Sequence, residues 1–381
     1  MKTYDYIICG AGCAGLTFLY EILAYKNLAN KNILIIDATF KTENDRTWCF
    51  WQQENNVFEK IVKHKWNNLH FEAVDHNNTF SINPYYYKII NGLDFYNFVL
   101  NFASSFKNVV FAKEKIIEIE NTASGAVVKT NQNTYLSNYV FNSIIFDESA
   151  LNTKNSLLQH FKGIIIETTE PVFSPTEATF MDFTVSQQNG TTFMYVLPTS
   201  STRALVEYTL FTKFILKEEE YDAALQDYIK NKLQITDYRI VHTEFGIIPM
   251  TDFKFPTHNG NIINIGTAAG CVKSSSGFAF RFIQKYTKQI IELLIQGKKP
   301  IVKRTFNDKK FHFYDSVLLE VIAQNKMQGS EIFTSIFKRN SPQLVLKFLD
   351  NETNIWEDIK IMSSVPMKVF LPIAIRKLFA V

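Results

Sequence analysis

Residues 4–15 have the sequence YDYIICGAGCAG, and this stretch decides the fold. An apolar run leads into Gly10, Gly12 and Gly15, which fit the pattern G-x-G-x-x-G, and a helical apolar pattern follows. In this pattern the first glycine permits a tight turn and the second lets the backbone approach a pyrophosphate. The third lets the helix pack closely on the strand. A second apolar strand over residues 32–36 completes a βαβ unit, which predicts a Rossmann-like α/β domain.

An acidic residue follows this second strand. Asp37 lies 22 residues after Gly15, where a carboxylate can bind a ribose hydroxyl. The phosphates are expected at the start of the helix, near Gly12 and Ala14, where free N–H groups and the helix dipole favour negative charge. We therefore predict that Gly10, Gly12, Ala14, Gly15 and Asp37 bind a dinucleotide. The alternative is a chance glycine turn.

A second glycine cluster lies about 250 residues later. Residues 262–270 read IINIGTAAG, and Gly277 follows a run of three serines at the start of a long helical pattern. A ligand that touches both clusters suits FAD better than NAD, with Gly266, Thr267, Ala268 and Gly277 as further cofactor-binding residues. Ser276 or a neighbour is expected to cap the helix, whose positive end would face the flavin ring. The alternative is an ordinary strand–turn–helix corner. The expected apolar face of this helix repeats every four residues, at Phe278, Phe282, Tyr286, Ile290 and Leu294.

The rest of the chain suggests three regions. The FAD-binding domain, of the glutathione-reductase or hydroxylase type, is expected over residues 1–170 and 250–299. Alternating segments within residues 171–249 predict an inserted antiparallel sheet that binds substrate. Residues 300–381 are expected to form short helices, with a possible membrane contact.

Composition excludes several classes of protein. The 381 residues carry a net charge of +3, which is too small for a nucleic-acid-binding surface. The chain contains no run of 18 apolar residues, so the sequence predicts no membrane-spanning helix. The first residues are predicted to form a strand and not a signal peptide. Four cysteines without a C-x-x-C pair indicate a reducing compartment, and scattered histidines indicate no metal site. We expect a cytoplasmic, metal-free protein without an obligate protein partner.

Further motifs resemble those of the lycopene β-cyclase family of FAD-dependent carotenoid enzymes, and the resemblance covers nearly the whole chain. They occur in the family's order, as Asp45-Arg46-Thr47-Trp48, FMYVLP (193–198), LVEYT (205–209), GIIPM (246–250), GTAAG (266–270), GSEIF (329–333) and LKFLD (346–350). The resemblance places Arg46 near the flavin; otherwise its loop is anchored by packing of the neighbouring Trp48. Many members of this family have two adjacent acidic residues where this chain has Glu207-Tyr208, so Glu207 is left as the leading acid.

The resemblance implies an isomerisation in which the acyclic ψ-end groups of lycopene become β-ionone rings. The steps are protonation of an alkene, ring closure through a carbocation and loss of a proton. Glu207 shares a strand face with mostly apolar residues, and a carboxyl group in apolar surroundings keeps its proton at neutral pH. The alternative is that the side chain of Glu207 faces solvent. Asp182 is a second candidate acid or base, with a structural hydrogen-bonded role as its alternative.

The same resemblance implies reduced FAD as the active cofactor and NAD(P)H as its reductant. The chain has no second G-x-G-x-x-G, so nicotinamide is expected to dock only transiently, or another donor reduces the flavin. One rival is a redox flavoenzyme of the same fold, an FAD-dependent monooxygenase or a prenyl-chain reductase. Another is a non-enzymatic flavin- or carotenoid-binding protein.

Lycopene is a C40 hydrocarbon dissolved in membrane lipid, so the resemblance also implies peripheral association with the cell membrane. After Asp358 the chain has basic and apolar residues but no acidic residue. This pattern suits a helix lying at an anionic lipid surface. The alternative is a terminal helix docked on the protein, because Pro366 and Pro372 would interrupt any long helix.

Overall fold

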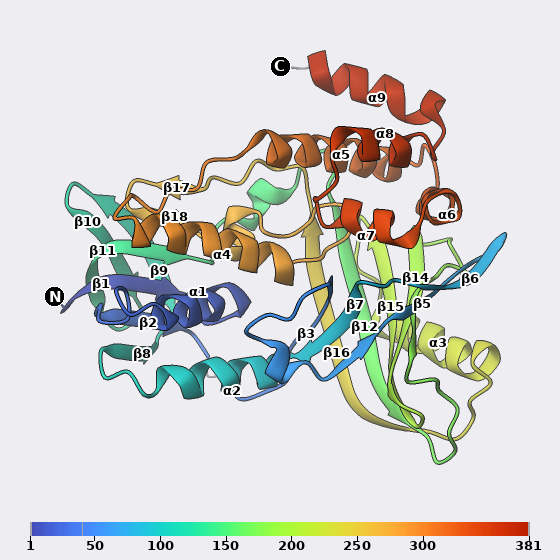
Figure 1. Ribbon diagram of the computed structural model, residues 1–381, viewed down its shortest axis with the longest axis horizontal. Helices are drawn as coiled ribbons and strands as arrows, with labels where there is room; N and C mark the ends of the chain where they lie inside the picture. The colour runs from blue at the N-terminus through green and yellow to red at the C-terminus, as the bar shows by residue number, and fades with distance from the viewer. Residues whose placement is uncertain (1, 40, 380–381) are drawn as a thin grey trace.

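The computed structural model describes residues 2–39 and 41–379. Figure 1 shows a domain with a parallel sheet at the left, a large twisted sheet at the right and a group of helices above both. The cavity described below is lined by residues from the parallel-sheet domain and from the large sheet.

The parallel sheet carries the βαβ unit that the sequence predicts. Its strands follow the order β17-β18-β11-β1-β2-β8, and β18, β11, β1, β2 and β8 are parallel to one another. The antiparallel strands β9 and β10 extend it from β11. The bounds are β1 Lys2–Cys9, β2 Ile33–Asp37, β8 Val109–Lys113, β9 Ile116–Thr122, β10 Gly125–Thr130, β11 Thr134–Asn142, β17 His258–Asn259 and β18 Ile262–Asn264.

Three helices pack together beside this sheet: α1 (Cys13–Ala24), α2 (Gly92–Ala103) and α4 (Phe280–Ile295). Helix α4 follows the second glycine cluster, as predicted. Of its predicted apolar face, Phe282, Tyr286 and Leu294 pack against the core but are only partly buried. A strict four-residue repeat drifts around a helix of 3.6 residues per turn. The buried residues are instead Phe280, Ile283, Thr287, Ile290 and Ile291.

The large sheet has the order β16-β12-β15-β14-β13-β5-β6 and is antiparallel except where β13 pairs with β5. Apolar residues of β12, β14 and β15 pack against helix α3 (Glu218–Asp227), which continues as a π-helical turn, η3 (Tyr228–Lys232). Residues on the opposite face join a core with the C-terminal helices. The bounds are β5 Asn68–Ala73, β6 His76–Ser81, β12 Leu157–Glu167, β13 Glu177–Asp182, β14 Thr191–Ser200, β15 Arg203–Thr212 and β16 Arg239–Met250.

This sheet draws on more of the chain than the predicted segment 171–249. Strands β5, β6 and β12 precede that segment and still belong to the sheet. Strand pairing over such distances depends on register with partners that lie far away in the sequence, so a local pattern does not reveal it.

A small sheet and the C-terminal helices complete the fold. The small sheet pairs β7 (Tyr86–Asn91) with β3 (Thr47–Gln52) and β4 (His64–Trp66). Short 3₁₀ helices are η1 Glu59–Ile61, η2 Glu148–Leu151 and η4 Gly266–Ala269. The C-terminal helices are α5 Phe306–Ala323, α6 Gly329–Arg339, α7 Pro342–Leu349, α8 Ile355–Met362 and α9 Met367–Phe379. Within residues 2–39 and 41–379, no helix has both the length and the apolar content that crossing a bilayer requires.

Candidate functional site

The first glycine motif forms a tight loop between β1 and α1. Gly10 has φ of +98°, in the region that favours glycine. A Cβ built on Gly15 would lie 1.9 Å from the carbonyl oxygen of Gly10, so only glycine fits this contact of helix and loop. At Gly12 a Cβ would meet no heavy atom of the described residues within 4 Å. The loop is therefore closed on its protein side and open at Gly12, the N-cap of α1.

Asp37 lies beside this loop, at the end of β2. Its Oδ2 accepts a hydrogen bond of 2.7 Å from the backbone N–H of Ala11, and its Oδ1 accepts two from Thr39. The carboxylate therefore sits next to the glycine loop, where the sequence placed it.

The second glycine cluster packs directly on the first. Gly266 has φ of +57°, and a Cβ there would lie 2.5 Å from the Cβ of Ala14. Helix η4 begins at Gly266, and Ala268 is buried within it. Behind the cluster, Lys273 forms a buried ion pair of 2.7 Å with Asp315 of α5. The C-terminal helices thus hold the second cluster in place.

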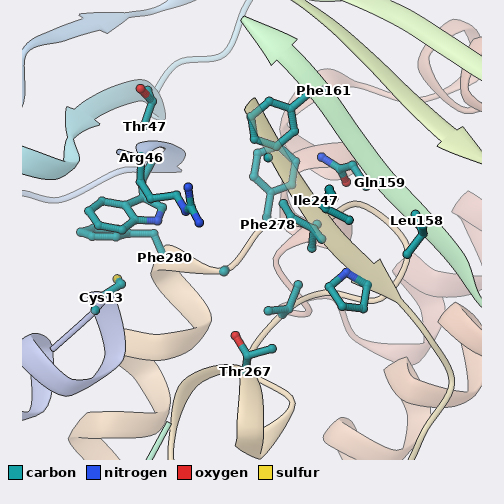
Figure 2. Close-up of a pocket in the computed structure, with 18 of the residues that line it drawn as sticks. Cys13, Arg46, Thr47, Leu158, Gln159, Phe161, Ile247, Thr267, Phe278 and Phe280 are labelled. Atoms are coloured by element: carbon teal, nitrogen blue, oxygen red, sulfur yellow. The ribbon is translucent and has the colours of Figure 1, made fainter. Parts of the chain in front are cut away.

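Both clusters line one cavity of about 990 Å³ (Figure 2). Its wall includes the predicted cofactor residues Gly12, Ala14, Arg46, Thr267 and Gly277. Figure 2 shows Cys13 and Thr267 on one side of the hollow and Gln159, Phe161 and Ile247 on another. Aromatic side chains supply much of the apolar wall, namely Trp48, Tyr87, Tyr96, Phe161, Tyr195, Phe278 and Phe280.

Two polar atoms beside the second cluster lack partners. The buried Ser276 Oγ and Gln159 Oε1 have no hydrogen-bond partner among the described residues, and both side chains line the cavity. The prediction that Ser276 or a neighbour caps α4 was wrong, because the N-cap is Ala279, whose methyl group cannot accept a hydrogen bond. Left-handed backbone at Gly277, with φ of +71°, separates Ser276 from the helix.

Glu207 lines the same cavity from the middle of β15. Its Oε1 accepts a hydrogen bond of 2.7 Å from Thr209, two residues along the same strand face. Burial, followed by the nearby Glu244 carboxyl, raises the pKa of Glu207 to about 8. At neutral pH this carboxyl group therefore retains its proton.

Glu244 of β16 is a second carboxyl group, which lies beside Glu207, and the sequence analysis missed it. Its side chain is buried, and its Oε2 accepts a hydrogen bond of 2.6 Å from Thr47. Glu244 lies two residues before Gly246, which lines the cavity, so both are on the same face of β16. This spacing in the sequence could have identified Glu244 as a candidate. The next residue after Glu207 faces away from the cavity: the ring of Tyr208 contacts Tyr221 of α3.

Asp182 does not line the cavity. Its carboxylate is buried and accepts hydrogen bonds from the Thr184 N–H (2.8 Å), the Thr184 hydroxyl (2.6 Å) and the Tyr228 hydroxyl (2.7 Å). Of the two predicted acids, the structure thus brings only Glu207 to the cavity that both glycine clusters line.

The fold is shared with several solved proteins, one of them described as a flavoprotein. The chain superposes on a geranylgeranyl bacteriochlorophyll reductase-like protein from Thermoplasma acidophilum with a TM-score of 0.65 and 14% identity, covering 99% of both chains. A flavoprotein/dehydrogenase from Cytophaga hutchinsonii gives 0.68 and 10%, again over 99% of both chains. The p-nitrophenol 4-monooxygenase of Pseudomonas putida gives 0.61 and 13%, covering 99% of this chain and 98% of the other. At these identities the likeness concerns the fold alone.

Sequence comparison is more specific. A stretch of 130 residues, 32% of this chain, is 32% identical to the lycopene beta-cyclase of Paracoccus sp. (strain N81106 / MBIC 01143). The match spans only about a third of that relative, 33% of its length. Residues 5–374 match the family described as lycopene cyclase protein. With nearly its whole length matched, this chain belongs to the lycopene cyclase family.

Proposed function

We propose that this protein is a lycopene β-cyclase, which converts the acyclic ends of lycopene to β-ionone rings without net redox change. One observation carries the proposal: Glu207, a carboxyl group whose pKa is raised by burial, lines a cavity with seven aromatic residues in its wall. An alkene is a weak base, so it needs a well-placed acid in a site that excludes water. Membership of the lycopene cyclase family supports the substrate class.

The residues of the cavity fit FAD. Gly12 leaves open space at the N-terminus of α1 for a pyrophosphate, and Asp37 lies at the end of β2 for a ribose hydroxyl. Ser276 and Gln159 offer buried, unpartnered polar atoms near the second cluster. We propose that Thr267 and these two residues hold the ring system. Reduced FAD, with NAD(P)H as its reductant, would supply negative charge that stabilises a carbocation.

The chain itself contributes the proton and the aromatic surroundings. Glu207 donates its proton to the terminal alkene, and the faces of Tyr87 and Tyr195 lie in the same wall. Each aromatic face stabilises a nearby cation by about 0.5–2 kcal/mol. Burial keeps the pKa values of both phenols raised, so neither competes as an anion.

The test of this proposal is a reaction under anaerobic conditions. Purified protein with chemically reduced FAD is incubated with lycopene in lipid vesicles, and the products are identified by absorption and mass. We expect cyclised products of unchanged mass without stoichiometric consumption of reductant. Glu207→Gln should bind FAD and lycopene normally and lose at least about 100-fold in rate, the usual contribution of a general acid.

The rival functions give different results in the same assay. A product that differs by two hydrogens or by an oxygen atom would identify a reductase or a monooxygenase. Unchanged pigment with normal FAD binding would identify a binding protein. Normal cyclisation by Glu207→Gln would remove Glu207 from the mechanism.

We also propose that α9 places the protein on the membrane that supplies lycopene. This helix continues through Pro372 and packs through the buried Ile373, and Lys377 pairs with Asp252 at 3.1 Å. Its other side exposes a stripe of apolar residues to solvent, namely Met367, Leu371, Ile375, Leu378 and Phe379. Trp356 of α8 is 81% exposed, and Lys360 and Lys368 are exposed basic residues of α8 and α9. Figure 1 shows α9 outermost among the C-terminal helices. An apolar stripe with nearby basic residues suits an anionic lipid surface.

Point substitutions test this surface better than truncation, because truncation would also uncover the core around Ile373. The double variant Leu371→Ser/Ile375→Ser should co-sediment less with anionic vesicles while retaining its melting temperature. Val74→Ser, at an apolar position that is 88% exposed in another region, is the matched control and should sediment normally. Unchanged sedimentation of the double variant would mean that another surface binds the membrane.

A further inference from the structure

Strand register brings a second carboxyl group close to Glu207, which lines the cavity. In the order β16-β12-β15, Gly163 of the central strand pairs with Glu207 on one side and with Glu244 on the other. Residues in register on one face of neighbouring strands point the same way, so both carboxyl groups extend over Gly163. Glu207 and Glu244 are 37 residues apart in the sequence.

Gly163 provides the space for this arrangement. A Cβ at this position would lie 3.1 Å from Cγ of Glu244 and 3.1 Å from Cδ1 of Leu205. Any larger side chain would displace the glutamate. The missing side chain thus lets the two glutamates meet across the middle strand.

Each carboxyl group is fixed by its own hydroxyl donor. Thr209 donates to Oε1 of Glu207 at 2.7 Å, and Thr47 donates to Oε2 of Glu244 at 2.6 Å. The two groups are close enough for the Glu244 carboxyl to raise the pKa of Glu207. Two carboxyl groups can hydrogen-bond to each other only when one of them carries a proton.

We infer that Glu207 and Glu244 share one proton, and that Glu244 is the positioning residue that keeps this proton on Glu207. This inference rests on the proposed cyclase function and extends it. Two like charges at such close range cannot both be ionised at low cost, so the pair holds a proton where a lone carboxylate would lose it. Because the groups are coupled, their titration belongs to the pair.

The surroundings decide which of the two carries the proton. Burial raises the pKa of Glu244, but the Thr47 hydroxyl, His242 and Arg46 act in the opposite direction and favour its ionised form. Near Glu207 the other titratable groups are Cys49, Tyr87 and Tyr195. Burial raises the pKa of all three, so they remain neutral. None of them supplies a positive charge that would favour ionised Glu207. The proton therefore resides on Glu207, which faces the cavity.

The acid step then balances with no electron transfer. The O–H bond of Glu207 breaks, and a C–H bond forms at the inner carbon of the terminal alkene, which leaves the positive charge on the outer carbon. Ring closure moves the positive charge onto a ring carbon. Loss of a proton from the carbon next to it restores a double bond, and this proton returns to the carboxylate pair. The pair ends as it began.

The test measures the titration of Glu207 with and without its partner. In the wild-type holoenzyme, the infrared band of a protonated carboxyl group that is absent from Glu207→Gln should disappear near pH 8. The rate of cyclisation, measured with excess chemical reductant at each pH, should fall over the same range, because only the protonated acid acts. In Glu244→Gln, which keeps the size of the side chain, both transitions should move to lower pH by on the order of one unit.

Variants of Thr47 give a second measurement that does not require Glu244→Gln to fold. Thr47→Val removes the donor that favours ionised Glu244, so the proton moves partly onto Glu244 and the rate at neutral pH should fall. Thr47→Ser keeps the hydroxyl and should restore the rate. A carboxyl band that stays at the wild-type pH in Glu244→Gln, or equal rates for the Val and Ser variants, would overturn the inference.

The infrared titration needs no lycopene, which separates the two proposals. If the band shifts in Glu244→Gln but neither the wild type nor any variant cyclises lycopene, the proposal of a shared proton stands and the proposed cyclase function is wrong. If lycopene is cyclised but the band is unaffected by Glu244→Gln, the proposed cyclase function stands and the proposal of a shared proton is wrong.

Discussion

Two parts of the candidate site are built in different ways. In the first part, residues 10–15 form a loop whose shape is set by backbone contacts a few residues apart, such as Gly15 against the carbonyl group of Gly10. In the second part, Glu207 and Glu244 come from different strands and meet only because β12 pairs with both. The first part is sensitive to added atoms near the backbone. The second is sensitive to charge and to strand register.

The largest effect expected from this difference is at Gly15. A Cβ in Gly15→Ala would lie 1.9 Å from the carbonyl oxygen of Gly10, and neither backbone can move without separating α1 from β1. We expect the free energy of unfolding to fall by at least about 3 kcal/mol, the upper part of the range for overpacked cores. Denaturant unfolding measures this loss. A variant as stable as the wild type would show that the loop is more adaptable than its geometry indicates.

Gly12→Ala should have a smaller effect of a different kind. Its Cβ meets no heavy atom of the described residues within 4 Å, so the fold should lose only about 1 kcal/mol from a poorer N-cap. The added methyl group would stand where the pyrophosphate is proposed to approach. FAD should therefore bind at least about tenfold more weakly, or about 1.4 kcal/mol. Flavin fluorescence titration measures the affinity, and unchanged affinity would place the phosphates elsewhere.

The same contrast explains what the sequence could predict. Gly10, Gly15 and Asp37 lie in one βαβ unit, where residue spacing alone fixes their meeting, and the structure places them together. Glu207 was identified through a family motif and strand alternation, and it does line the cavity. Glu244 was missed because its partner is set by the register of β16 on β12, and no local pattern reports that register.

Two smaller differences between prediction and structure also arise from contacts between distant parts of the chain. Ser276 was expected to cap α4, but the chain makes a left-handed turn at Gly277 before the helix begins. Asp182 was correctly placed in a strand, yet its hydroxyl partner Tyr228 comes from the turn after α3. In both cases the sequence placed the residue in the right segment. The direction of its side chain, however, depends on how that segment packs in the folded chain.

Asp182 offers the smallest effect and the sharpest test of the contrast between two carboxyl groups of the large sheet. Asp182→Asn keeps one oxygen to accept from Thr184, and the Tyr228 hydroxyl can accept from the new amide instead of donating to the carboxylate. We expect a loss of about 0.5–1 kcal/mol in unfolding free energy, no more than a typical hydrogen bond contributes.

The rate of cyclisation per folded molecule should be unchanged in Asp182→Asn, because this carboxyl group does not line the cavity. Glu207→Gln, its matched counterpart, should show the reverse: stability maintained or increased and activity lost. Removing an ionisable group whose pKa is raised in the folded state relieves the cost of ionising it as the pH rises towards 8. Loss of activity in Asp182→Asn at unchanged stability would make Asp182 part of the chemistry after all. The two substitutions together therefore separate a carboxyl group that holds the sheet to its helix from one that donates a proton.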